Sequence, residues 1–371
     1  MAARPAASTA PLRLSGIDAL KAIACTCIVW HHLVFYGLMA DVARPLAPAL
    51  LDAFQTHGRV AVHVFLAIGG FLAAGSVASI PFARAADPLR LIARRYLRLA
   101  APYLVALGVS VLAASLVRAV LQDDEVVPAS PQPLQLLAHG LLLQDLLDVP
   151  GLSAGVWYVA IDFQLYALTV LVFALAAWLQ LRWRADAQRL TQALVVAGAA
   201  LSMLVFNLDP AYDETALYFF GSYGLGLMAW WAGRSRHAGA WLLLMVGLGA
   251  TALAFEWRDR LAAAWITALL IVALQRSASL SAIEPPAAVR QLGRISYSVF
   301  LVHFPVCLLV AAATHALWPQ DAWFNALGMV AAFALSVLAG ALLHRGTESR
   351  PPGLPGVLAL LGLLLLFGVW L

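Results

Sequence analysis

Residues 17–39 form the first apolar stretch of the chain and read IDALKAIACTCIVWHHLVFYGLM. A helix needs about 20 mainly apolar residues to cross a bilayer, and this stretch is long enough. Ten similar stretches follow: 60–80, 97–121, 154–178, 190–207, 214–232, 240–256, 261–276, 293–314, 322–343 and 354–371. Backbone groups in lipid must be satisfied within the segment, so each stretch is predicted to be helical. The pattern predicts an all-α polytopic transmembrane bundle of about 10–11 membrane-spanning helices.

The composition agrees with a membrane protein. Of the 371 residues, 63% are hydrophobic and 11% are charged, whereas an average soluble domain has about 25% charged residues. This balance excludes a soluble globular enzyme, a disordered chain, a secreted disulfide scaffold and a nucleic-acid binder. Lipids are therefore the expected surroundings of most of the surface.

The distribution of Lys and Arg predicts the orientation of the bundle. Eighteen of the 23 basic residues fall on one side of the expected spans, and the other five are Arg44, Arg59, Arg118, Arg258 and Arg260. Short cytoplasmic loops carry the excess of positive charge. The N-terminus is therefore expected in the cytoplasm, as in an integral protein of a bacterial inner membrane.

We expect one transmembrane unit over residues 1–350 and an additional C-terminal membrane helix over 351–371. The longest external segment is 121–153, which is rich in Pro and acidic residues, including Asp123, Asp124 and Glu125. We expect it to be a solvated connection. The alternative is that it forms a wall of an outer cavity.

Ionisable side chains inside spans are costly and commonly functional, and the first span has several. Lys21 and His32 are eleven residues apart, which places them on nearly the same helix face with a rise of about 16 Å. A ligand of that length would touch both. The alternative is that Lys21 extends to the membrane surface and that the histidines are satisfied by neighbours. His31 points to a different face from His32 and is a candidate pocket or structural residue.

Further polar residues mark other spans. His63 lies at the outer end of the second span, whose Gly69, Gly70 and Gly75 favour close helix packing. Arg94, Arg95 and Arg98 lie within about one helical turn of the expected cytoplasmic surface. They form either an ordinary positive-inside loop or a phosphate clamp, since arginine binds phosphate through paired hydrogen bonds.

The fourth span begins GVWYVAIDFQLYAL, and its Asp162 needs a partner inside the membrane, either His32 or an arginine. Trp157 and Tyr158 fit an interfacial aromatic belt and are also pocket candidates. His303, in the ninth span, is interpreted first as a satisfied core histidine and second as a pocket residue. We find no metal-binding motif and expect no metal.

These motifs, in this order, resemble the acyltransferase-3 family of integral membrane acyltransferases over roughly residues 12–350. The segments that carry the resemblance are RLSGIDALKAIACTCIVWHH (13–32), VAVHVFLAIGGFL (60–72), RRYLR (94–98), GVWYVAIDFQLY (155–166), GRISYSVFLVHFP (293–305) and HRGTESRP (344–351). The basic residue and histidine eleven positions apart correspond to Lys21 and His32. Lys21 stands where Arg is commoner, Asp162 where Glu is commoner, and Gly69 and His63 where many members have Ser and Asp.

The resemblance implies transfer of an acyl group, most often acetyl, from acyl-CoA to a hydroxyl of a carbohydrate, such as a surface polysaccharide or its lipid-linked precursor. His32 would be the catalytic base or nucleophile, with Asp162 beside it in the catalytic set. Lys21, Arg94, Arg95 and Arg98 would bind the coenzyme. The alternative function is a transporter that exports a glycan or an acylated intermediate, since intramembrane charges also occur there. The sequence leaves the oligomeric state open.

Overall fold

The computed structural model describes residues 14–78, 87–121, 126–184 and 186–370, and every regular element in these ranges is helical. The long helices are α1 (Ser15–Phe35), α4 (Ala61–Ala78), α6 (Pro88–Val117), α8 (Val156–Trp183), α9 (Ala187–Leu204), α10 (Ala216–Arg234), α11 (Ala238–Phe255), α12 (Asp259–Arg276), α14 (Ala287–Leu317), α15 (Ala322–Leu343) and α16 (Leu354–Trp370). The short helices are α2 (Ala40–Ala43), α3 (Pro48–His57), α7 (Pro133–Gly140) and α13 (Ala278–Ser281).

Every expected span coincides with one of the long helices, which confirms the all-α polytopic bundle. Within the described ranges, eight helices are long and apolar enough to cross a membrane. The three other expected spans are α10, α12 and α16. The first two have sufficient length but less apolar character, and α16 is apolar but has only 17 residues.

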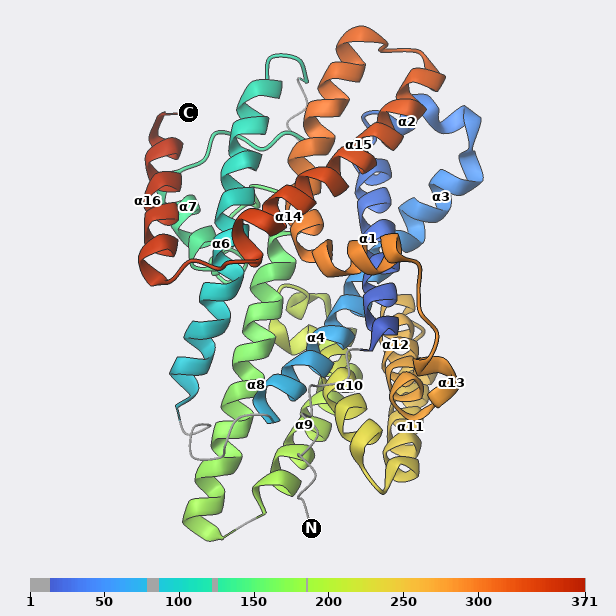
Figure 1. Cartoon of the computed structure of the whole chain (residues 1–371), viewed down its shortest axis with the longest axis vertical. Helices are drawn as coiled ribbons and strands as arrows, with labels where there is room; N and C mark the ends of the chain where they lie inside the picture. The colour runs from blue at the N-terminus through green and yellow to red at the C-terminus, as the bar shows by residue number, and fades with distance from the viewer. Residues whose placement is uncertain (1–13, 79–86, 122–125, 185, 371) are drawn as a thin grey trace, which may run out of the picture.

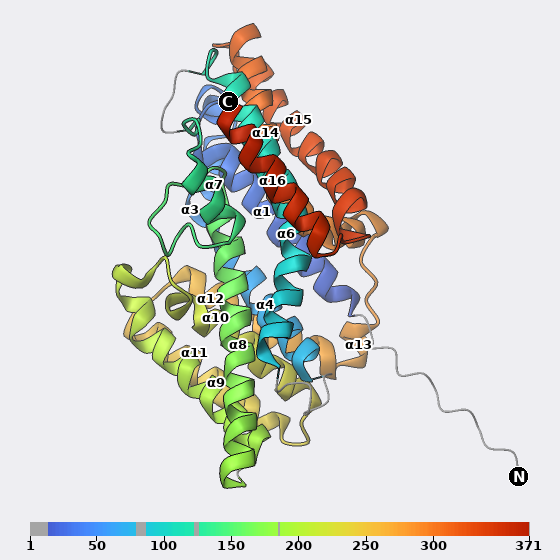
Figure 2. The same ribbon diagram turned by 90° about the vertical axis from the view of Figure 1, so that its left-hand side faces the viewer.

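The helices form an elongated bundle (Figures 1 and 2). Helices α8 to α12 gather towards one end, and α14, α15 and α16 gather towards the other. Helix α1 lies between these groups and packs against both α4 and α14. Its polar residues Asp18 and His32 contact side chains of α14.

Close helix contacts depend on glycine. Helices α4 and α10 approach so closely that a Cβ atom on Gly70 would overlap the backbone carbonyl of Tyr223. A Cβ atom on Gly226 would likewise overlap the carbonyl of Ala67. The packing role expected for Gly70 is confirmed. Small residues allow backbones to approach where lipid supplies no hydrophobic drive for association.

Aspartate side chains cap several of the helices. Asp87 accepts a hydrogen bond from the backbone N–H of Arg90 at 3.1 Å, and Asp186 accepts one from Arg189 at 3.2 Å. Asp321 accepts from the first turn of α15. These bonds satisfy backbone donors that a helix leaves free at its start, so the sequence fixes where α6, α9 and α15 begin.

Some residues used for the expected topology lie outside the described ranges. They are Arg4, Arg13, Arg84 and the acidic group Asp123, Asp124 and Glu125.

Candidate functional site

Among the described residues, one cavity lies towards each end of α1. The outer cavity has a volume of about 1520 Å³ and lies at the end expected to face away from the cytoplasm. The inner cavity has a volume of about 690 Å³. The outer cavity is lined by residues of α1, α14, the loop before α8 and the start of α10. The inner cavity is lined by residues of α1, α4, α6, α8, α14 and the π-helical turn His344–Glu348.

The segment between α6 and α8 forms one wall of the outer cavity from residue 126 onward. The expectation of a solvated connection is therefore wrong for this part. Hydrogen bonds hold the segment in place: Ser110 donates to Ser153 at 3.1 Å, and the Leu152 N–H donates to Nε2 of His139 at 3.2 Å. The bond from Ser110 of α6 ties the segment to the bundle, and the bond to His139 of α7 holds the segment together internally.

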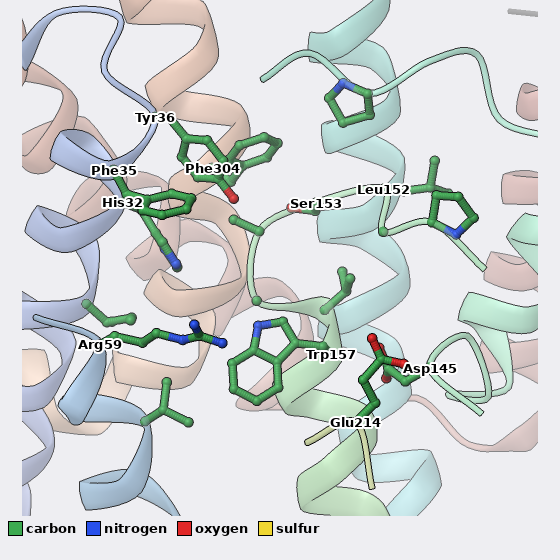
Figure 3. A pocket seen from close by; sticks show the side chains of 18 of the residues that line it. His32, Phe35, Tyr36, Arg59, Asp145, Leu152, Ser153, Trp157, Glu214 and Phe304 are labelled. Atoms are coloured by element: carbon green, nitrogen blue, oxygen red, sulfur yellow. The ribbon is translucent and has the colours of Figure 1, made fainter. Parts of the chain in front are cut away.

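His32 lies in the wall of the outer cavity, as Figure 3 shows. Its Nδ1 is 2.7 Å from Nε2 of His303 on α14, and the two rings are within 8° of parallel. Nδ1 of His303 is in turn 2.6 Å from the backbone carbonyl oxygen of Phe300. His303 is fully buried, whereas His32 is partly exposed to the cavity.

This chain of hydrogen bonds has a direction. The carbonyl of Phe300 can only accept, so Nδ1 of His303 carries the hydrogen. In a neutral imidazole, Nε2 of His303 is then an acceptor, and Nδ1 of His32 must donate to it. Nε2 of His32 therefore keeps its lone pair. A histidine held in this tautomer can accept a proton or attack an electrophile.

The outer cavity has basic and acidic sides with an indole between them (Figure 3). The Arg59 guanidinium lies 5.9 Å from the ring centre of Trp157. Across from Arg59 are the carboxyl groups of Asp145 and Glu214. Burial, followed by the charge of Glu214, raises the pKa of Asp145 from 3.8 to about 6. This side of the cavity therefore gains negative charge as the pH rises through about 6.

The inner cavity is basic. Lys21, Arg95, Arg98 and Arg294 line it. Asp18 lies between two of these cations, with its carboxylate 3.4 Å from Nζ of Lys21 and 4.0 Å from Nε of Arg294. Because cations outnumber carboxylates along this wall, the cavity suits an anionic ligand.

Asp162 also lines the inner cavity, and its partner is Arg95. Arg95 donates from Nη2 to Oδ2 of Asp162 at 2.5 Å, joining α6 to α8. Asp162 was expected to pair with His32 or with an arginine. In the structure Asp162 pairs with an arginine, and His32 pairs with His303. Nε of Arg95 is buried and has no hydrogen-bond partner among the described residues, which leaves a donor for a polar ligand.

The other candidate residues differ in which cavity they line, and some line neither. Trp157 lines the outer cavity and Tyr158 the inner one. His31 lines the outer cavity, but its Nδ1 already bonds the Phe54 carbonyl at 3.0 Å. His63 is buried 2.8 Å from the Ser222 hydroxyl and lines neither cavity.

Arg94 is exposed on α6 and also lines neither cavity, although Arg95 and Arg98 line the inner one. The expected cluster of three arginines is therefore divided by the geometry of the helix. Arg94 has a place consistent with an ordinary positive-inside loop.

Sequence reasoning missed several charged cavity residues, among them Arg59, Asp145, Glu214 and Arg294. Arg59 and Arg294 contributed only to the expected topology. For Arg294 a signal existed, since it lies three residues before Tyr297 on one helix face, and both line the inner cavity. Asp145 and Glu214 come from separate loops, and no sequence pattern connects them.

A family model described as an acyltransferase domain matches residues 14–345. The match covers both histidines of the hydrogen-bonded chain and all four cations of the inner cavity. Glu348 and α16 lie beyond its end. No curated protein and no solved structure matches the chain.

Removing either partner of the Arg95–Asp162 pair is expected to destabilise the protein. The variants Arg95→Gln and Asp162→Asn should each lower the free energy of unfolding by about 3 kcal/mol, because each leaves a charge without its partner. The double variant should lose clearly less than the sum. Unfolding in detergent micelles measures all three. Arg94→Gln is the matched control on the same helix and should change stability by less than about 0.5 kcal/mol. Additive losses would show that the two charges do not interact.

Proposed function

The chain belongs to the acyltransferase-3 family of membrane acyltransferases, and on this premise we propose that it transfers an acyl group from acyl-CoA to a carbohydrate hydroxyl. Acetyl-CoA is the proposed donor. The acceptor is a surface polysaccharide or its lipid-linked precursor, and the membrane is the bacterial inner membrane. The observation that carries the proposal is the free lone pair on Nε2 of His32, at the edge of a cavity that can hold an acceptor.

The inner cavity would bind the donor from the cytoplasm. Its four cations suit the phosphates of coenzyme A, and guanidinium groups bind phosphate with paired hydrogen bonds. The unpaired Nε of Arg95 offers a further donor to the polar part of the ligand. Lys21 and His32 are separated by about 16 Å along α1, so an extended arm could connect the phosphates with the base.

The proposed reaction uses His32 as a general base. Nε2 removes the proton from the acceptor hydroxyl while the hydroxyl oxygen attacks the thioester carbonyl. The new C–O ester bond forms, the C–S bond breaks, and the imidazolium returns the proton to the departing coenzyme A sulfur. His303 accepts the Nδ1 hydrogen bond of His32 throughout and fixes the orientation of the ring. Asp162 positions Arg95 rather than the imidazole.

The outer cavity would bind the acceptor. Trp157 offers an apolar indole face, and Asp145 and Glu214 offer oxygen acceptors for hydroxyl groups. Such a mixture of aromatic and polar groups is suited to a ligand with apolar faces and many hydroxyls. These features support a carbohydrate acceptor.

Replacing His32 tests the base directly. His32→Ala should lower acyl transfer by about 10²-fold or more, because the attacking hydroxyl loses its proton acceptor. The assay follows label from radiolabelled acetyl-CoA into the glycan and lipid fractions of membranes that contain the protein. His315→Ala, at an exposed site on α14, is the control and should retain wild-type transfer. Retained transfer in His32→Ala would remove His32 from the mechanism.

The same membranes can be used to test whether His32 acts as a general base or as a nucleophile. Without acceptor, a general base should give no exchange of label between acetyl-CoA and free coenzyme A. An acyl-imidazole intermediate would give rapid exchange.

His303 is expected to act through His32. His303→Ala should lower kcat about 10-fold to 100-fold, with the KM for the donor changed less than twofold, because the ring of His32 loses its orientation. His303→Gln should recover part of kcat, since its amide oxygen accepts and its amide nitrogen donates. A purely structural role would predict equal losses in both variants and lower amounts of folded protein.

Donor binding is tested by two arginines on one helix. Arg98→Gln should raise the KM for acetyl-CoA about tenfold, which is the loss of one charge-assisted contact. Arg94→Gln, one turn earlier and outside the cavity, should leave the KM unchanged. An unchanged KM in Arg98→Gln would contradict the placement of the coenzyme.

A further inference from the structure

The proposed donor site and the proposed base lie in different cavities. Lys21, Arg95 and Arg98 line the inner cavity, and His32 lines the outer one. Among the described residues, Phe300 is the one that lines both. The ring of Phe300 therefore lies where the two cavities adjoin, between the proposed coenzyme site and His32.

An aromatic layer occupies this boundary. It consists of Phe65 on α4, Tyr158 on α8 and Phe300 on α14. The ring centre of Tyr158 is 5.2 Å from that of Phe300, and Phe65 lies 6.2 Å from Tyr158 and 6.4 Å from Phe300. The three rings thus contact one another from three helices. Phe65 and Tyr158 line the inner cavity with Arg95, and Phe300 also lines the outer cavity.

The sequence places the layer at one level of the bundle. Phe300 is one turn before His303, and Tyr158 is one turn before Asp162, which lies on the inner side. Gly155 faces the layer from the outer side, where a Cβ atom would come within 2.5 Å of the Phe300 ring. The ring of Phe300 is therefore held between the start of α8 and α4.

We propose that this aromatic layer restricts the donor to acyl groups without charge, so that Phe65, Tyr158 and Phe300 determine donor specificity. The inference rests on the proposed function and adds to it the chemical class of the acyl group. The acyl end must cross the layer ahead of the pantetheine arm. An acetyl or butyryl group crosses an apolar layer at little cost, whereas a carboxylate would lose its water without gaining a partner.

The charged residues on either side of the aromatic layer strengthen the discrimination against charged acyl groups. A carboxylate on the acyl group would be attracted by Lys21, Arg95 and Arg294, which lie before the layer. Arg59 lies beyond it, in the outer cavity, and offers no partner during the crossing. An acidic acyl-CoA should therefore bind but deliver its acyl group poorly.

Butyryl-CoA and succinyl-CoA form a matched pair, because both acyl chains have four carbons and only succinyl carries a carboxylate. With membranes containing the wild-type protein, label should transfer from butyryl-CoA at least 100-fold faster than from succinyl-CoA. Succinyl-CoA should still compete with labelled acetyl-CoA, with an inhibition constant within about tenfold of the KM for acetyl-CoA.

Variants of the aromatic layer should change the ratio of butyryl transfer to succinyl transfer. Phe65→Gln, which puts an amide into the layer, should raise succinyl relative to butyryl transfer at least tenfold. Phe65→Leu keeps the position apolar and should leave the ratio unchanged. Tyr158→Gln provides a second polar variant should Phe65→Gln fold poorly. Phe333→Gln, on α15 outside both cavities, controls for a polar substitution in a packed aromatic position.

The outcomes separate the two proposals. Equal wild-type use of succinyl and butyryl donors, or a ratio that no polar variant of the layer changes, would overturn the inference and leave the proposed function intact. Transfer from none of acetyl-, butyryl- or succinyl-CoA would overturn the proposed function, and the inference with it.

Discussion

A charge or polar group inside a bilayer needs a partner, and in two pairs of this protein the partners come from different helices. Arg95 and Asp162 join α6 to α8, and His32 and His303 join α1 to α14. An unpaired group at these positions would be costly in lipid. The same contacts that satisfy this requirement set the helices around the two cavities. Polar pairing therefore organises the site, while small residues such as Gly70 organise the surrounding helix packing.

The fold could be predicted from apolar length, because each helix satisfies its own backbone and needs no knowledge of its neighbours. The pattern of residues 17–39 also predicted Lys21 and His32 on one face, and each lines one of the cavities. Pairing was harder to predict, since it depends on which helices are adjacent. His303 was interpreted first as a satisfied core histidine, and only the packing of α14 against α1 makes it the partner of His32.

The two cavities differ in charge as their proposed ligands do. The inner cavity is basic, whereas the outer one sets Arg59 against Asp145 and Glu214. The segment after residue 126, which was expected in solvent, forms one wall of the outer cavity. A thioester that reached His32 through the bundle would therefore meet an acceptor beside the residues of this segment.

Phe300 contributes to the site in two independent ways. Its carbonyl accepts the hydrogen bond of His303, and its ring lines both cavities. A backbone carbonyl is the same whichever side chain it carries. Substitution at this position can thus alter the barrier while leaving the imidazole chain in place. Related proteins could therefore come to transfer different acyl groups through changes at this position, while the hydrogen-bonded histidine pair stays the same. The same substitutions are open to protein engineering.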